Sequence, residues 1–164
     1  MAKKYSVYIA FAVGLILYAY ITGHDTDKSA VLKCTKELNE NYATMEKIVS
    51  FLNDQKYKDC EDLYLSSTHN GKSAYLECNG SIIESIDTSV GKIELSINNE
   101  IKDYLNNRWD ASISKDKDSN VFWGFGLASY TFEHYSLCYG KHISPEYKVV
   151  KEIRPGWFVV RYKD

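Results

Sequence analysis

The stretch YKVVKEIRPGWFVVRY, residues 147–162, decides the fold class of this chain. Valines and aromatic residues favour extended backbone, and they predict strands over 147–153 and 157–162. Between the strands, the segment Arg154–Trp157 (RPGW) predicts a type II turn, because proline fixes the second position and glycine accepts the positive φ of the third. So short a turn returns the chain beside itself, which makes the two strands antiparallel neighbours.

Further strands are predicted upstream of this hairpin. Two of them, over 121–127 and 129–139, lie in a region crowded with aromatic residues. Two more are predicted over 62–67 and 73–78, on either side of a tight turn. Asn70-Gly71 marks that turn, because both central residues of a two-residue hairpin loop need positive φ.

Two helices complete the predicted fold. Apolar side chains recur at three- and four-residue steps over 27–53, which predicts an amphipathic helix that packs on the sheet or on a partner's helix. A second helix is predicted over 88–107, although alternating apolar residues at 93–97 also suit a strand. The segment 111–120 is rich in Asp and Lys, so we expect a solvated loop there. The order of helix, hairpin, helix and late strands indicates an α+β fold with an antiparallel sheet of C-terminal strands.

Residues 6–23 form an uncharged apolar run that follows Lys3 and Lys4. As a helix the run spans about 27 Å, enough for a thin bilayer, and its terminal tyrosines suit the headgroup layers. We therefore expect 1–23 to be a cytoplasmic stub and single-pass inner-membrane anchor, and 24–164 to be a periplasmic domain. The alternative is a cleaved signal peptide, whose apolar core is usually shorter and ends at an A-x-A-like site.

All four cysteines, Cys34, Cys60, Cys78 and Cys138, follow the apolar run. Export places them in an oxidising compartment, so we expect two disulfides. Of the three possible connectivities, we favour Cys60–Cys78 across the hairpin with Cys34–Cys138 closing a long loop. In a cytosolic domain the four would instead be buried thiols. There is no C-x2-C pair, so no metal site is predicted.

Composition and motifs exclude several function classes. The chain has 164 residues and a net charge of −2, so it shows no basic footprint for direct nucleic-acid binding. It contains no G-x-S-x-G, H-E-x-x-H, P-loop or G-x-G-x-x-G motif. We therefore expect a protein that is not an enzyme and takes no cofactor. Asn79-Gly80-Ser81 matches a glycosylation sequon, which we treat as a coincidence.

Seven aromatic residues between 122 and 139 are the candidate ligand or partner surface. They either fill the core of a small domain or line a groove for an amphipathic ligand or partner strand. They are Phe122, Trp123, Phe125, Tyr130, Phe132, Tyr135 and Tyr139. Histidines titrate near pH 6.5, so an exported domain can sense external pH through one of them. The candidates are His134, on a largely apolar strand, and then His142 and His69; the alternative is that these are ordinary exposed or hydrogen-bonded histidines.

The layout of Lys3-Lys4, the apolar run 6–23 and a cysteine-bearing domain of this size resembles a class of bacterial signalling accessories, the ToxS-like proteins. The partner proteins of the Psa and Myf fimbrial regulators of Yersinia are similar in size and character. The resemblance is one of architecture and carries over no functional residue. It implies a membrane-anchored periplasmic protein that binds and stabilises a membrane-bound winged-helix transcription regulator, relaying pH or ligand signals to virulence or fimbrial genes. The alternatives are another envelope interaction protein, for phage exclusion, immunity or secretion, and a small-ligand binder that uses the aromatic strands.

Overall fold

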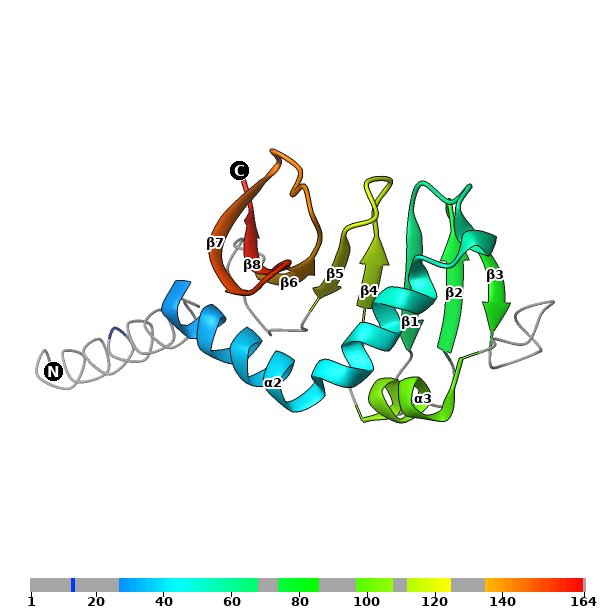
Figure 1. The fold of residues 1–164 in the computed structure, drawn as a ribbon, viewed down its shortest axis with the longest axis horizontal. Helices are drawn as coiled ribbons and strands as arrows, with labels where there is room; N and C mark the ends of the chain where they lie inside the picture. The colour runs from blue at the N-terminus through cyan, green and yellow to red at the C-terminus, as the bar shows by residue number, and fades with distance from the viewer. Residues whose placement is uncertain are drawn as a thin grey trace, which may run out of the picture.

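The computed structural model describes residues 13, 27–67, 74–85, 97–107, 112–124 and 135–163. Within them the chain forms an α+β fold of two α-helices, a short 3-10 helix and an eight-stranded antiparallel sheet (Figure 1). This confirms the predicted fold class. The membrane helix predicted over 6–23 lies outside the described residues, except for Val13. Among the residues that are described, no helix is both long enough and apolar enough to cross a membrane.

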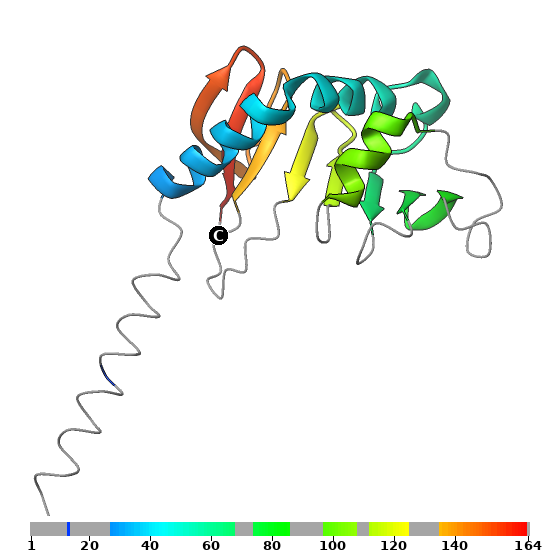
Figure 2. The same ribbon diagram turned by 90° about the horizontal axis from the view of Figure 1, so that it is seen from below.

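The elements follow one another along the chain as α2 (Asp27–Leu52), η1 (Gln55–Tyr57), β1 (Leu63–Ser67), β2 (Ala74–Cys78), β3 (Ser81–Ser85), α3 (Asn99–Asn106), β4 (Ser112–Lys115), β5 (Val121–Gly124), β6 (Tyr135–Tyr139), β7 (Tyr147–Arg154) and β8 (Trp157–Tyr162). In the sheet the strands lie in the order β3-β2-β1-β4-β5-β6-β8-β7, and each neighbouring pair is antiparallel. Helices α2 and α3 lie on the same side of the sheet (Figure 2).

Helix α2 forms where it was predicted, and its buried side chains follow the helical period. They are Ala30, Cys34, Leu38, Met45, Ile48 and Leu52. The helix is kinked at Asn41, whose backbone leaves the helical region (φ −125°, ψ 16°). The Asn41 amide donates to the Glu37 carbonyl oxygen at 3.2 Å and to its carboxylate at 2.9 Å. A side chain that hydrogen-bonds a backbone carbonyl of its own helix competes with the helical hydrogen bonds and allows a bend. The bend is visible midway along α2 in Figure 1.

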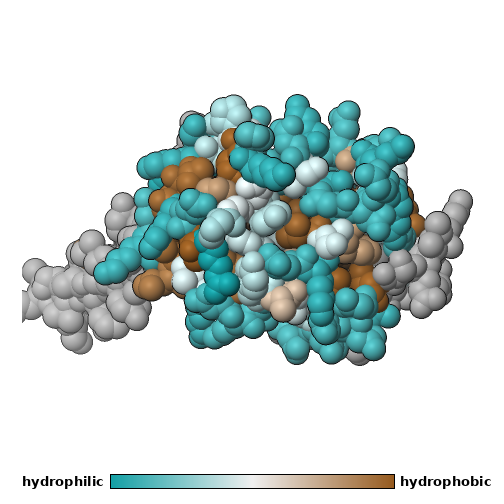
Figure 3. All heavy atoms as spheres, in the orientation of Figure 1, coloured by the Kyte–Doolittle hydropathy of each residue, from teal (hydrophilic) through white to brown (hydrophobic). Residues whose placement is uncertain are grey.

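The main core lies between the sheet and the two helices. Alternate strand residues point into it, among them Leu63, Leu65, Ile113, Val121, Leu137 and Val159. At its centre Trp123 and Trp157 are almost fully buried, with ring centroids 5.2 Å apart. Large apolar side chains left exposed are scattered, as Figure 3 shows for one face, where hydrophilic residues surround separate apolar areas.

Both predicted hairpins are confirmed, and the predicted loop between them needs correction. The hairpin of β1 and β2 pairs as expected, with its turn outside the described residues. Strands β7 and β8 also pair, and Gly156 at their turn has φ +79°, as a type II turn requires. The predicted loop 111–120 instead contains strand β4, because Ile113 is buried between β1 and β5.

The second correction concerns the segment after β2. Strand β3 was not predicted; it is formed because Asn79 and Gly80, with φ 48° and 79°, make a tight turn out of β2. The predicted helix 88–107 is described only from residue 97. There α3 begins after Asn98, whose side chain caps the helix by accepting from the backbone N–H of Ile101 at 2.9 Å.

The cysteine predictions are half right. Cys60 and Cys78 form a disulfide, as predicted. The predicted Cys34–Cys138 bond is wrong, since both residues are buried thiols. Neighbouring residues of a strand point to opposite faces. Leu137 of β6 faces the main core with Cys34, so Cys138 points to the far side of the sheet and packs against Phe122.

The two edge strands of the sheet differ. Strand β7 has eight residues, two register irregularities and exposed side chains at Lys148 and Lys151. Strand β3 has five residues, one register irregularity in its pairing with β2, and exposed side chains at Ser81 and Ile82. Within the described part of the chain, no strand pairs with the outer edge of either one.

Candidate functional site

The face of the sheet opposite the helices carries the candidate site. Side chains that alternate with the core residues point to this face, among them Tyr64 of β1, Ser114 of β4 and Phe122 of β5. There they border a groove of about 530 Å³. The groove is lined by Glu61, Asp62, Tyr64, residues 114–118, Phe122 and residues 144–147. Its volume lies within the range of about 300–1,000 Å³ typical of ligand sites.

Three aromatic side chains form what we call the aromatic floor of the groove: Tyr64, Phe122 and Tyr147. Phe122 is buried and stacks on Tyr147, with ring centroids 4.9 Å apart and planes inclined by 26°. Tyr147 in turn meets Tyr162 edge-on at 5.6 Å. Burial raises the pKa of Tyr147, so its ring stays uncharged at physiological pH. Tyr64 remains 43% exposed, so it is accessible to a ligand or a partner protein.

Five carboxylates form the acidic rim of the groove: Glu61, Asp62, Asp116, Asp118 and Glu146. Two lysines, Lys115 and Lys117, also line it. The Lys115 ammonium, however, donates to the backbone carbonyl of buried Tyr57 at 3.3 Å, on the side of the helices. Its burial there lowers the pKa of Lys115. The groove therefore presents an excess of negative charge.

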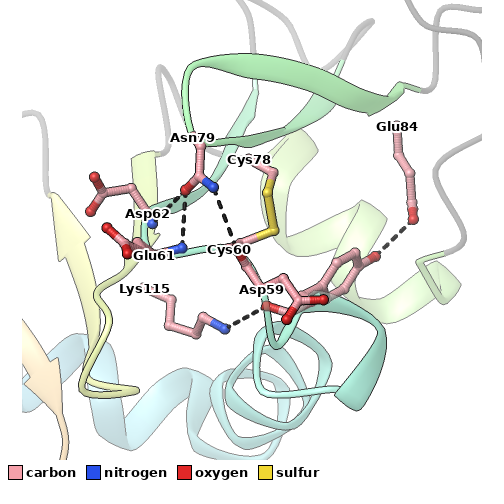
Figure 4. Close-up of a disulfide and its surroundings, with 9 residues drawn as sticks. Asp59, Cys60, Glu61, Asp62, Cys78, Asn79, Glu84 and Lys115 are labelled. Atoms are coloured by element: carbon pink, nitrogen blue, oxygen red, sulfur yellow. Dashed lines mark hydrogen bonds between the residues drawn. A yellow bond between two sulfur atoms is a disulfide. The ribbon is translucent and has the colours of Figure 1, made fainter.

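The first part of the rim is held by the disulfide and Asn79 (Figure 4). The Asn79 side-chain oxygen accepts the backbone N–H groups of Glu61 and Asp62 at 3.0 and 3.1 Å. Its backbone N–H donates to the Asp62 carbonyl oxygen at 2.9 Å. Cys60 and Cys78 join the same two segments covalently. Glu61 and Asp62 therefore stand on a backbone that is fixed from the neighbouring strand.

The rest of the rim is tied together by Asn120. Its side-chain N–H groups donate to the Asp116 carboxylate at 2.9 Å and to the His142 carbonyl oxygen at 3.0 Å. The same carboxylate accepts the backbone N–H groups of Asp118 and Asn120, which fixes the β4–β5 turn. Asn120 is fully buried and lies so close to Gly140 that a side chain at 140 would collide with it. These contacts join the β4–β5 turn to the loop that leads to β7.

The structure divides the predicted aromatic surface between the two faces of the sheet. Phe122 lies in the groove. Trp123 and Tyr135 are buried on the helix side, and Tyr139 packs there against Trp157 at 5.0 Å. The alternation along β5 and β6 separates them, because adjacent residues of a strand cannot share a face.

The remaining predicted site residues are five outside the described part of the chain and one exposed histidine. Phe125, Tyr130, Phe132, His69 and His134 lie outside the described residues. His142 is exposed and takes part in the site through its backbone carbonyl. Sequence reasoning missed Tyr64 and Tyr147. For Tyr64 the signal is alternation with the buried Leu63 and Leu65, whereas the burial pattern of β7 does not alternate and gives no such signal for Tyr147.

The groove offers aromatic ring faces and carboxylate groups, and both kinds of group can bind a ligand or a partner protein. Within the described residues, no three His, Cys, Asp or Glu side chains are placed to share a metal ion. No protein-family model matches the chain, and no curated protein or solved structure matches it either.

Proposed function

We propose that this chain is a membrane-anchored periplasmic accessory protein that binds and stabilises the periplasmic domain of a membrane-bound winged-helix transcription regulator. The observation that supports this proposal is the groove on the face of the sheet opposite α2 and α3. It has a rigid base of paired strands, an exposed aromatic residue and a polar rim. Aromatic side chains at the centre with polar groups around them are typical of protein interfaces.

The expected anchor strengthens the argument by its position. Helix α2 begins at Asp27, four residues after the apolar run 6–23 ends. An anchored domain with so short a connection stays beside the bilayer, as does a regulator with its own span. Confinement of both partners raises their effective concentration, so a modest intrinsic affinity gives a stable complex.

Stabilisation of the regulator follows from mass action. A partner that binds only the folded domain stabilises it by about 2.7 kcal/mol when its concentration is a hundred times the dissociation constant. Proteolysis that tracks the unfolded population then slows by about a hundredfold. If pH or a ligand changes the affinity of the two domains, the same coupling relays that signal.

The small-ligand alternative has less support. It relied on a cavity walled by the aromatic run, and Trp123 and Tyr135 fill the core instead. The groove is polar at its rim and carries one exposed ring, Tyr64, which suits a protein segment better than an enclosed ligand.

The test is affinity purification of the tagged full-length chain from detergent-solubilised native membranes, with mass spectrometry of what copurifies. The control is an unrelated single-span protein with the same tag. A winged-helix protein with one membrane span, recovered in near-equal amount, supports the proposal. A different envelope protein in that position overturns the regulator assignment, and recovery of the chain alone overturns the binding role.

A further inference from the structure

We infer that the groove receives a basic segment of the partner protein, with a lysine or arginine side chain over the aromatic floor and further cations along the acidic rim. The inference rests on the proposed function, because it takes the occupant to be a protein. It adds the charge and the kind of side chain that the partner brings to the groove, which the membrane-anchored layout alone does not specify.

The aromatic floor of the groove suits a cation. A cation over the face of a tyrosine or phenylalanine is attracted by the ring's negative face. This chain uses that contact elsewhere, since the Arg154 guanidinium lies 4.5 Å from the ring centre of Tyr42 and the Lys56 ammonium 4.5 Å from that of Tyr57. Tyr64, with 43% of its surface exposed, offers the same group at the groove.

Negative charge is concentrated at the groove. The whole chain has nearly balanced charge, with 20 basic and 22 acidic residues. The groove nevertheless is lined by five carboxylates and two lysines. The ammonium of Lys115 is hydrogen-bonded on the helix side, so Lys117 is the lysine that offsets the negative charge in the groove. A concave surface with an excess of one sign of charge draws partners of the opposite sign and selects against others.

The carboxylates of the acidic rim are spread along the groove. They come from three separate segments, at 61–62, 116–118 and 146, and no three of them in the described structure are arranged to hold one metal ion. A volume of about 530 Å³ also exceeds the needs of a single side chain. An extended segment that carries several cations fits this distribution better than a metal ion or a small amine.

The test uses a fluorescein-labelled decapeptide of alternating arginine and serine, titrated with the full-length chain in neutral detergent and followed by fluorescence anisotropy. A second peptide with citrulline in place of arginine keeps the shape and removes the charge. We expect the citrulline peptide to bind at least tenfold more weakly. Raising NaCl from 50 to 500 mM should weaken the arginine peptide and leave the citrulline peptide unchanged.

Matched variants locate the site. Asp62→Asn with Glu146→Gln removes two carboxylates of the rim, while Glu40→Gln with Asp103→Asn removes two exposed carboxylates from α2 and α3 on the other face. Exposed ion pairs are individually weak, so the rim variant, which loses two of them, should bind about fivefold more weakly and the control within twofold of wild type. Tyr64→Ala should weaken binding about threefold through the lost ring contact. Circular dichroism spectra that overlay with wild type establish that each variant is folded.

Equal weakening in the rim and control variants would overturn the inference, since only net charge would matter. Equal binding of the citrulline peptide would overturn it too, as would N-acetylarginine amide binding as tightly as the decapeptide. Membrane purification separates the two proposals. If the Asp62→Asn, Glu146→Gln variant retains a regulator in full amount, the groove inference fails while the proposed function stands. If wild type retains no partner but binds the arginine peptide at the rim, the proposed function fails while the cation preference of the groove stands.

Discussion

A single methyl group at Gly140 should destabilise the fold strongly, because of its position beside Asn120. A Cβ at residue 140 would lie 1.9 Å from Asn120 Oδ1 and 2.8 Å from its Cγ. Asn120 is fully buried, and its amide is bonded to both Asp116 and the His142 carbonyl, so it cannot turn away without breaking those bonds. Overpacking costs about 1–3 kcal/mol, and each lost hydrogen bond about 1 kcal/mol. We expect Gly140→Ala to lower the free energy of unfolding by about 3–4 kcal/mol.

The assay is a double-mutant cycle in urea on the fragment 24–164, followed by tryptophan fluorescence. Asn120→Ala removes the colliding amide and leaves the Asn120 Cβ, 3.2 Å from the added methyl, a contact that a small shift relieves. The double variant should therefore be nearly as stable as Asn120→Ala alone, with a coupling energy of about 2–3 kcal/mol. Gly80→Ala serves as the control: Gly80 has φ +79° and open space around it, so we expect a loss of about 1–2 kcal/mol without coupling to residue 120.

Two results would refute this reasoning. One is a loss below about 1 kcal/mol for Gly140→Ala, which would mean that Asn120 is free to move. The other is strict additivity of Gly140→Ala and Asn120→Ala, which would place the cost outside their contact.

Three further predictions concern stability, all measured by urea unfolding of the same fragment. Replacing Cys60 and Cys78 by serine opens a loop with a sequence separation of 18 and should cost about 3 kcal/mol, and a loss under about 1 kcal/mol would contradict the loop-entropy argument. Burial lowers the pKa of Lys115, so the folded protein binds fewer protons than the unfolded chain as pH approaches 10.5. The stability of wild type relative to Lys115→Met should therefore rise between pH 8 and 10, and a constant or falling difference would count against it. Tyr135→Phe removes a hydrogen bond of 2.6 Å to Asp27 and should cost about 1 kcal/mol, whereas an unchanged unfolding midpoint would show that water replaces the bond equally well.

The parts of the fold that could be predicted from the sequence are those with local signals. The period of α2, the alternation of β1 and β2 and the turn before β8 each reside in a few consecutive residues. Strand β4 has no such signal, because its place between β1 and β5 depends on pairing with distant segments. Strand β3 does have a local signal that its prediction lacks, because Asn79-Gly80 is the same turn dipeptide as Asn70-Gly71 of the first hairpin.

The candidate site was less predictable than the fold, for a physical reason. Phe122 belonged to a conspicuous aromatic run, whereas Tyr64 and Tyr147 are single residues in different strands. They meet only because the sheet brings β1, β5 and β7 to one groove. The failed Cys34–Cys138 pairing has the same origin. Which face a cysteine occupies depends on the register of its strand, and a shift of one residue reverses the answer.

The unequal edges of the sheet limit how copies of this chain can assemble. Two register irregularities and exposed lysines at β7 discourage backbone pairing at that end, whereas β3 has one such irregularity and carries no lysine. Two copies joined through β3, related by a two-fold axis, would each present only β7 to the outside, so growth stops at the pair. A strand from a foreign chain at β3 would use up the same edge. Edge-to-edge pairing of the described sheet is thereby self-limiting, because a pair joined through β3 leaves only β7 strands at its two ends.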